Sequence, residues 1–157
     1  MGRIRVVVVI TVLALLTGCS STFPVDPDGT LERVSGGTMR VGVSQHTPWV
    51  ETSDTGDPEG IEPKLIRGFA KDLDSDIEWT ESGEEQLMEA LERGDLDVVI
   101  GGFTDQTPWE EFGAVTRPYT EEKRDGKVRK HVMVVRMGEN AFLVELERFL
   151  MEQGGTQ

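Results

Sequence analysis

From position 38 onward, segments with the apolar spacing of strands alternate along the chain with segments that have the apolar spacing of helices. The segments 38–44, 76–80 and 96–100 are short and have the alternating or continuous apolar character of β-strands. Between them, 61–73 and 82–93 carry apolar residues three and four positions apart, as on one face of a helix. This order, with short connections, predicts an α/β fold with a small, mainly parallel sheet and flanking helices.

Local signals refine the second helix and extend the prediction to the C-terminus. Ser82 and Glu85 have the spacing of a capping box, and Gly94 stands where a helix commonly ends. Residues 130–136 are predicted to form a further strand. Residues 138–154 are predicted to form a closing helix with one apolar face.

The N-terminus has the features of an export signal. It begins with the basic MGRIR, continues with the apolar VVVVITVLALL, and reaches the only cysteine of the chain, Cys19, in LTGC. Residues 1–18 are therefore predicted to be a lipoprotein signal peptide, with Cys19 as the lipidated (palmitate-bearing) residue; the alternative is an uncleaved anchor helix with an incidental cysteine. Residues 19–36 are predicted to be a flexible tether. Residues 37–153 then suffice for a single domain.

The charge of the chain excludes some partners. The formal net charge is −13 at pH 7, which is unsuited to phosphate backbones or to adhesion on anionic lipid. Two histidines and a single cysteine make a zinc site improbable, and we predict no metal and no cofactor. Ser44 and His46 have no third member of a hydrolase triad, so no catalytic residue is predicted.

In an open parallel sheet, ligands bind beyond the carboxyl ends of the strands, where the winding direction reverses. If the first and third strands are neighbours there, the loops 44–49 and 101–111 face each other. Gly101 and Gly102 would let a ligand approach the backbone closely. The predicted ligand-binding residues are His46, Trp49, Gly101, Gly102, Phe103, Thr104, Trp109 and Glu110.

Several of these residues have a second interpretation. His46 either contacts a ligand or is only solvated, and His131, at the start of a predicted strand, is interpreted as structural. Trp49 and Trp109 either form an aromatic clamp with Glu110 supplying charge, or cover a face of the domain.

Four segments carry a resemblance to a known family. They are MRVGVSQHTPWV, EGIEPKLIRGFAKDL, LMEALERGDLDVVIGGFT and TRPYT, in this order. Their order and spacing resemble those of amino-acid-type (family 3) extracytoplasmic solute-binding proteins of ABC transporters. The resemblance implies a type II periplasmic-binding-protein fold and a return to the first lobe through the segment beginning KHVMVVR.

The chain departs from this family in two ways. The family inserts a whole second lobe after the segment matching RPYT, whereas this chain has only EEKRDGKVR, residues 121–129. We therefore expect a single lobe with a hairpin-like shortcut. The family also usually has an arginine after the Thr-Pro of the ligand loop to bind an amino-acid carboxylate, and that position falls on Trp109 or Glu110.

The resemblance implies a non-enzymatic receptor, lipid-anchored in the extracytoplasmic cell envelope (the periplasm or cell surface), that binds an amino-acid or amine-type solute for an ABC permease. The alternative is a protein-interaction or sensory module that uses the open lobe face, including self-association. An exposed apolar patch around Trp49, Phe103 and Trp109 would favour this alternative. A remnant without retained activity is a third interpretation.

Overall fold

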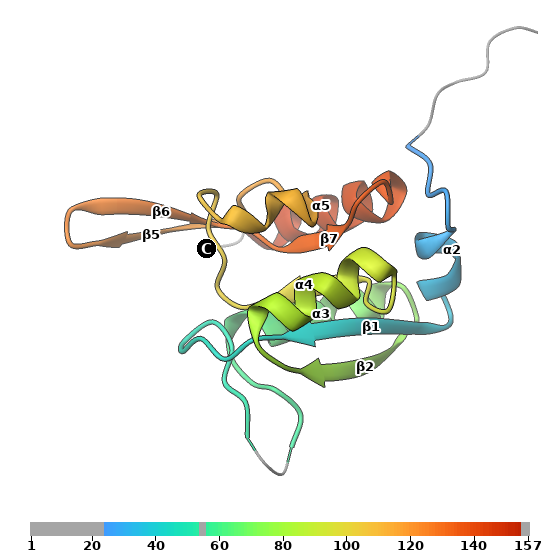
Figure 1. The fold of residues 1–157 in the computed structure, drawn as a ribbon, viewed down its shortest axis with the longest axis horizontal. Coiled ribbons are helices and arrows are strands. Elements are labelled where there is room, and N and C mark those ends of the chain that lie inside the picture. The colour runs from blue at the N-terminus through green and yellow to red at the C-terminus, as the bar shows by residue number, and fades with distance from the viewer. Residues whose placement is uncertain (1–23, 54–55, 155–157) are drawn as a thin grey trace, which may run out of the picture.

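The computed structural model describes residues 24–53 and 56–154, and its centre is a five-stranded sheet (Figure 1). The strand order is β2-β1-β3-β7-β4. β1 pairs in parallel with β2 and β3, whereas β7 is antiparallel to β3 and β4. The strands are β1 (Thr38–Val43), β2 (Asp76–Glu81), β3 (Val98–Ile100), β4 (Gly113–Val115) and β7 (Val134–Arg136). The predicted α/β fold with a mainly parallel sheet is confirmed.

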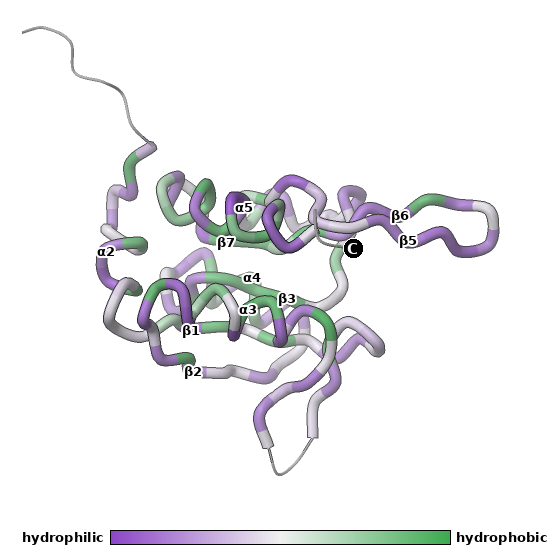
Figure 2. Tube along the Cα trace, turned by 180° about the vertical axis from the view of Figure 1, so that it is seen from behind, coloured by the Kyte–Doolittle hydropathy of each residue, from purple (hydrophilic) through white to green (hydrophobic). Residues whose placement is uncertain are grey.

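Helices cover both faces of this sheet. The helices are α2 (Thr30–Val34), α3 (Ile61–Asp72), α4 (Glu84–Arg93), η1 (Pro108–Glu111) and α5 (Asn140–Gly154). Side chains alternate along a strand, so Val98 packs in one apolar cluster with α3 and α5, and Val99 in another with α4. Figure 2 shows β3, between these helices, as hydrophobic. Among the described residues, no helix combines the length and the apolar character needed to cross a membrane.

The N-terminal segment is part of the folded domain, which corrects the prediction of a tether over its second half. The α2 helix begins at Thr30, and the Val34 side chain is completely buried in the core. The Asp26 carboxylate accepts hydrogen bonds from the backbone N–H groups of Ala141 and Phe142, at the start of α5. The segment thus caps a helix that lies 115 residues away in the sequence. The predicted signal peptide, Cys19 and the first part of the predicted tether lie outside the described residues.

Replacing Asp26 with alanine should lower the free energy of unfolding by about 1–2 kcal/mol, because α5 loses its N-terminal cap. Chemical denaturation at pH 7 measures this change. Asp57→Ala is the matched control, since the Asp57 side chain is 72% exposed and forms only a distant ion pair with Arg67. Equal stabilities for the two variants would contradict the capping role.

Two further local predictions were wrong. The predicted strand at 130–136 is divided, because His131 ends a separate hairpin strand and only Val134–Arg136 joins the sheet. The capping box at Ser82 and Glu85 is not formed: α4 begins at Glu84, and its N-cap, Gly83, makes no side-chain hydrogen bond. The Ser82 N–H instead donates to the Val43 carbonyl at 3.2 Å, which extends the pairing of the sheet.

Candidate functional site

The loops that follow β1 and β3 lie side by side, as predicted. The Ser44 N–H donates to the Ile100 carbonyl at 3.0 Å. A Cβ atom placed on Gly102 would lie 2.8 Å from Trp49 Cδ1 and 3.1 Å from His46 Cγ. The two loops therefore form one surface at the carboxyl ends of adjacent parallel strands.

A β-hairpin extends this surface beyond the sheet (Figure 1). It consists of β5 (Thr120–Arg124) and β6 (Lys127–His131). Asp125 and Gly126, with φ of 53° and 75°, form the turn that two-residue hairpins favour. The Asp105 N–H donates to the Lys130 carbonyl, which fixes the hairpin against the β3 loop. This hairpin is the predicted shortcut in place of a second lobe.

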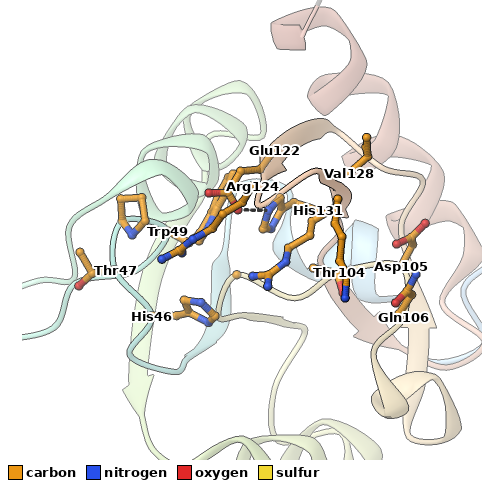
Figure 3. A pocket seen from close by; sticks show the side chains of 14 residues that line it. His46, Thr47, Trp49, Thr104, Asp105, Gln106, Glu122, Arg124, Val128 and His131 are labelled. Atoms are coloured by element: carbon orange, nitrogen blue, oxygen red, sulfur yellow. Dashed lines mark ion pairs between the residues drawn. The ribbon is translucent and has the colours of Figure 1, made fainter.

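The two loops and the hairpin enclose a cavity of about 490 Å³ (Figure 3). The first loop contributes residues 46–49, and the second contributes Gly102 and residues 104–106. The hairpin contributes Glu122, Arg124, Lys127, Val128, Arg129 and His131. The cavity lies where the topology of the sheet predicts a ligand crevice.

Half of the predicted ligand-binding residues line this cavity, namely His46, Trp49, Gly102 and Thr104. Gly101 and Phe103 are buried beside it in the same loop. Trp109 and Glu110 lie outside it: the Trp109 indole N–H donates to Glu84 at 2.7 Å, and its ring packs against Phe112. Trp49 and Trp109 belong to separate apolar clusters, so the structure does not bring them together as a clamp.

His131, which the sequence suggested to be structural, is both buried and part of the cavity wall. Its ring stacks on Trp49 with centroids 3.6 Å apart and planes inclined by 26°. The residue is 2% exposed, and neither ring nitrogen has a hydrogen-bond partner. Burial lowers the pKa of His131, and the nearby Glu122 opposes this shift. The imidazole is therefore neutral at pH 7.

Glu62 is a site residue that the sequence analysis missed. Its side chain is completely buried, and its carboxylate accepts hydrogen bonds from the Gly101 and Gly102 N–H groups, both at 2.9 Å. The Tyr119 hydroxyl donates to the other oxygen at 2.6 Å. Burial raises the pKa of Glu62 to about 7. The N–H groups of Gly101 and Gly102 thus donate to Glu62 and are not available to a ligand. The loop contributes to the cavity through its backbone conformation.

Gly102→Ala should destabilise the protein by about 1–3 kcal/mol and displace Trp49. The φ of Gly102 is +66°, and a Cβ would contact the Trp49 ring. Gly126→Ala is the matched control, because Gly126 has a φ of +75° but nothing within 4 Å of the added carbon. Denaturation monitored by tryptophan fluorescence measures both effects. If the two variants lose equal stability, the contact with Trp49 does not constrain the loop.

The sequence profile of bacterial extracellular solute-binding proteins, family 3, matches residues 39–154. The chain belongs to this family. Solved structures show the same fold. One is the arginine-bound form of domain 1 of the T. maritima arginine-binding protein, which is 24% identical with a TM-score of 0.66. The match covers 77% of this chain and 97% of that domain. A comparison with curated proteins finds no match.

Two other structures show the same similarity of fold. An ancestral amino-acid-binding protein, described as a precursor of cyclohexadienyl dehydratase, is 16% identical with a TM-score of 0.68, over 81% of this chain and 94% of that one. A Salmonella typhimurium periplasmic binding protein of high arginine specificity is 11% identical with a TM-score of 0.64, over 76% and 94%.

Within this family, the single lobe has no arginine in the ligand loop. The two positions that the family pattern would assign to this arginine, Trp109 and Glu110, both lie away from the cavity. Across the described residues, no group of three or more His, Cys, Asp or Glu side chains is arranged to hold a metal ion.

Proposed function

We propose that this family 3 protein is a lipid-anchored, extracytoplasmic receptor that binds a small amino-acid or amine-type solute without transforming it and passes the solute to an ABC permease. The observation that carries the proposal is the cavity of about 490 Å³ at the ends of β1 and β3, in a chain whose residues 39–154 match solute-binding proteins. Its volume lies within the range of about 300–1,000 Å³ typical of small-molecule sites.

Solute binding by a lone lobe has a precedent in a relative. The T. maritima relative is described as the arginine-bound form of domain 1, and 97% of that domain is covered here. In the present chain the β5–β6 hairpin forms one wall of the cavity, on the side that another lobe would close in the family. Because this wall is narrow, we expect less burial of the solute than the 70–90% or so of good pockets, and hence modest affinity.

The anchor is proposed from the sequence alone, since Cys19 lies outside the described residues. If it is lipidated, few residues separate the membrane from Asp26, the first residue whose side chain is bonded to α5. Cys19→Ala should move the protein from the membrane fraction to the soluble fraction of the envelope and abolish incorporation of labelled palmitate.

Thermal unfolding with acidic, neutral and basic amino acids and polyamines, each at millimolar concentration, tests solute binding. At least one solute should raise Tm, since binding to the folded state alone stabilises it. Gln106→Trp, which places a bulkier side chain at the wall of the cavity from an exposed position, should reduce the shift. A panel in which no solute raises Tm would overturn the proposal.

No specific observation favours the alternative of a protein-interaction module. The patch that would have supported it is not formed, because Trp49 and Phe103 are 7% and 6% exposed. Trp109 packs against Phe112 and bonds to Glu84. The apolar side chains of these two loops pack in or against the core instead.

A further inference from the structure

The β5–β6 hairpin has the opposite charge to the rest of the protein. The chain carries 29 acidic and 16 basic residues, yet residues 120–131 contain five cations and three acids. Figure 2 shows this hairpin as mainly hydrophilic. A cationic element in an acidic protein indicates a local role for its charge.

The two arginines of this hairpin differ from the other described arginines in that they form no ion pair. Nine arginines lie among the described residues, and seven have a carboxylate within 4 Å: Arg33, Arg40, Arg67, Arg93, Arg117, Arg136 and Arg148. In the part of the chain that the structure describes, Arg124 and Arg129 form no ion pair, and both line the cavity. Both side chains are exposed, so their guanidinium groups are free to bind a ligand at the cavity.

The charged groups of the cavity leave a small excess of positive charge, and Glu122, the cross-strand neighbour of Arg129, forms no ion pair with it. Lys127 adds a third cation to the wall, against Asp105 and Glu122. Glu122 lies toward the buried ring of His131, with its Oε2 3.7 Å from Nε2. That ring has no hydrogen-bond partner for either nitrogen, so the neutral imidazole has an N–H still to donate.

We propose that the solute is a small carboxylate anion, such as an acidic amino acid or a dicarboxylate, and that Arg124 and Arg129 of the hairpin bind its carboxylate. This inference rests on the proposed function and specifies the class of its solute. The planar guanidinium group pairs with a carboxylate in a bidentate manner, which a lysine cannot reproduce. The hairpin thus supplies, from the other wall of the crevice, the cation that the loop after Thr107-Pro108 lacks. The solute class differs from that of the arginine-binding relatives, since these unpaired cations repel a second cation.

Titration calorimetry on the full chain tests this proposal, with glutamate, succinate, phosphate, arginine and putrescine as probes at equal ionic strength. Glutamate or succinate should bind at least 10-fold more tightly than arginine or putrescine. The double variant Arg124→Gln, Arg129→Gln should weaken carboxylate binding by 10- to 100-fold, as expected for the loss of charge-assisted hydrogen bonds. The Tm of the solute-free double variant should equal that of the wild type, because both substituted positions are exposed.

Lys123→Gln combined with Lys130→Gln is the matched control, because these lysines belong to the same hairpin but do not line the cavity. It changes net charge equally and should alter affinity by less than 3-fold. If both double variants lose affinity equally, the effect comes from net charge alone, and the proposal is overturned. Binding of arginine or putrescine that is unaffected by the arginine substitutions would also overturn it, while the receptor function stands. Phosphate binding as tightly as succinate would reject carboxylate selectivity. The absence of binding by any probe would overturn the carboxylate proposal, while the receptor function is decided by the thermal unfolding panel.

Discussion

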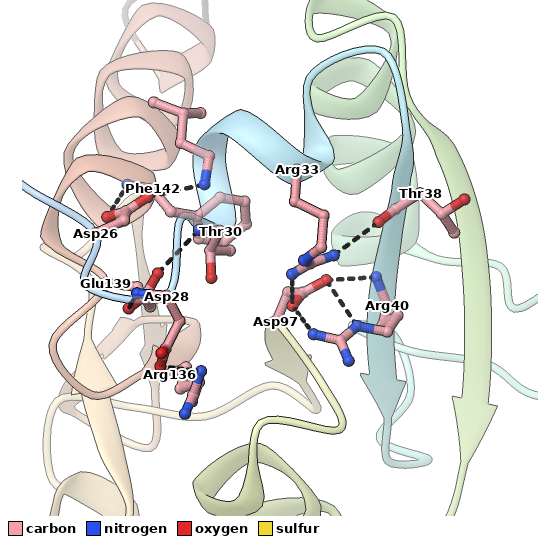
Figure 4. A network of polar contacts seen from close by, with 11 residues as sticks. Asp26, Asp28, Thr30, Arg33, Thr38, Arg40, Asp97, Arg136, Glu139 and Phe142 are labelled. Atoms are coloured by element: carbon pink, nitrogen blue, oxygen red, sulfur yellow. Dashed lines mark hydrogen bonds and ion pairs between the residues drawn. The ribbon is translucent and has the colours of Figure 1, made fainter.

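Asp97→Ala is expected to lower the free energy of unfolding by about 2–3 kcal/mol, because it removes a buried carboxylate that two partly exposed arginines share (Figure 4). The Asp97 side chain is 0% exposed, and its carboxylate accepts from the Arg40 backbone N–H at 2.8 Å and from the Arg40 guanidinium at 2.6 Å. Arg33 of α2 donates to the same carboxylate. The substitution removes the acceptor of the Arg40 donors and the side-chain link between α2 and the residue before β3, while Arg33 keeps its hydrogen bond to the Thr38 carbonyl.

Urea denaturation at pH 7 measures this loss. Asp95→Ala is the matched control, because Asp95 lies two residues away and its side chain is 62% exposed in a surface ion pair with Arg93. The control should change stability by no more than about 0.5 kcal/mol. A loss below about 1 kcal/mol for Asp97→Ala would show that rehydration of the two arginines compensates for the missing carboxylate.

Regular apolar spacing made the core of the fold predictable. Helix α5 was predicted from its apolar face, and Phe142, Leu146 and Leu150 are buried on that face. The apolar run over residues 96–100 was predicted to be a strand, and Val98, Val99 and Ile100 are all buried in β3. These signals are local in the sequence, because each element must bury the side that its own periodicity defines.

The N-terminal segment could not be predicted in this way, because its partners are distant. Asp26 caps α5, and Glu139 accepts hydrogen bonds from the N–H groups of Asp28 and Thr30 in return (Figure 4). Residues 26–34 contain too few apolar positions to show a period. Their turn-forming composition resembles that of a linker, although the structure uses it for capping.

The candidate site was predicted in position but not in detail. The topology placed the two crevice loops together, but the cations of the cavity come from the hairpin, whose charged residues show no spacing that indicates a shared target. Glu62 was missed because an acidic residue in the first turn of a helix is ordinarily a favourable surface residue. Its partners, the Gly101 and Gly102 N–H groups, lie 39 and 40 residues away.

Glu62 should make the stability of the protein fall as pH rises from about 4.5 to about 7. Burial raises the pKa of Glu62 from the ordinary 4.5 to about 7 in the folded state. Below this interval, the carboxyl is protonated in both states. Within it, the unfolded chain has lost the proton while the folded protein retains it, so folding becomes less favourable by about 1.4 kcal/mol per pH unit, or about 3 kcal/mol in all.

Comparison with Glu62→Gln isolates this contribution. The amide resembles the protonated carboxyl: its oxygen accepts from the Gly101 and Gly102 N–H groups, and it does not titrate. Urea denaturation at pH 4.5, 5.5, 6.5 and 7.5 should show the wild type losing about 3 kcal/mol relative to this variant. Glu59→Gln, at an exposed position nearby, should follow the wild type. Parallel curves for the wild type and Glu62→Gln would mean that the hydrogen bonds from the glycine loop and Tyr119 offset the burial of the charge. In the predicted case, the fall in stability ends near pH 7, where the carboxyl of the folded protein itself ionises.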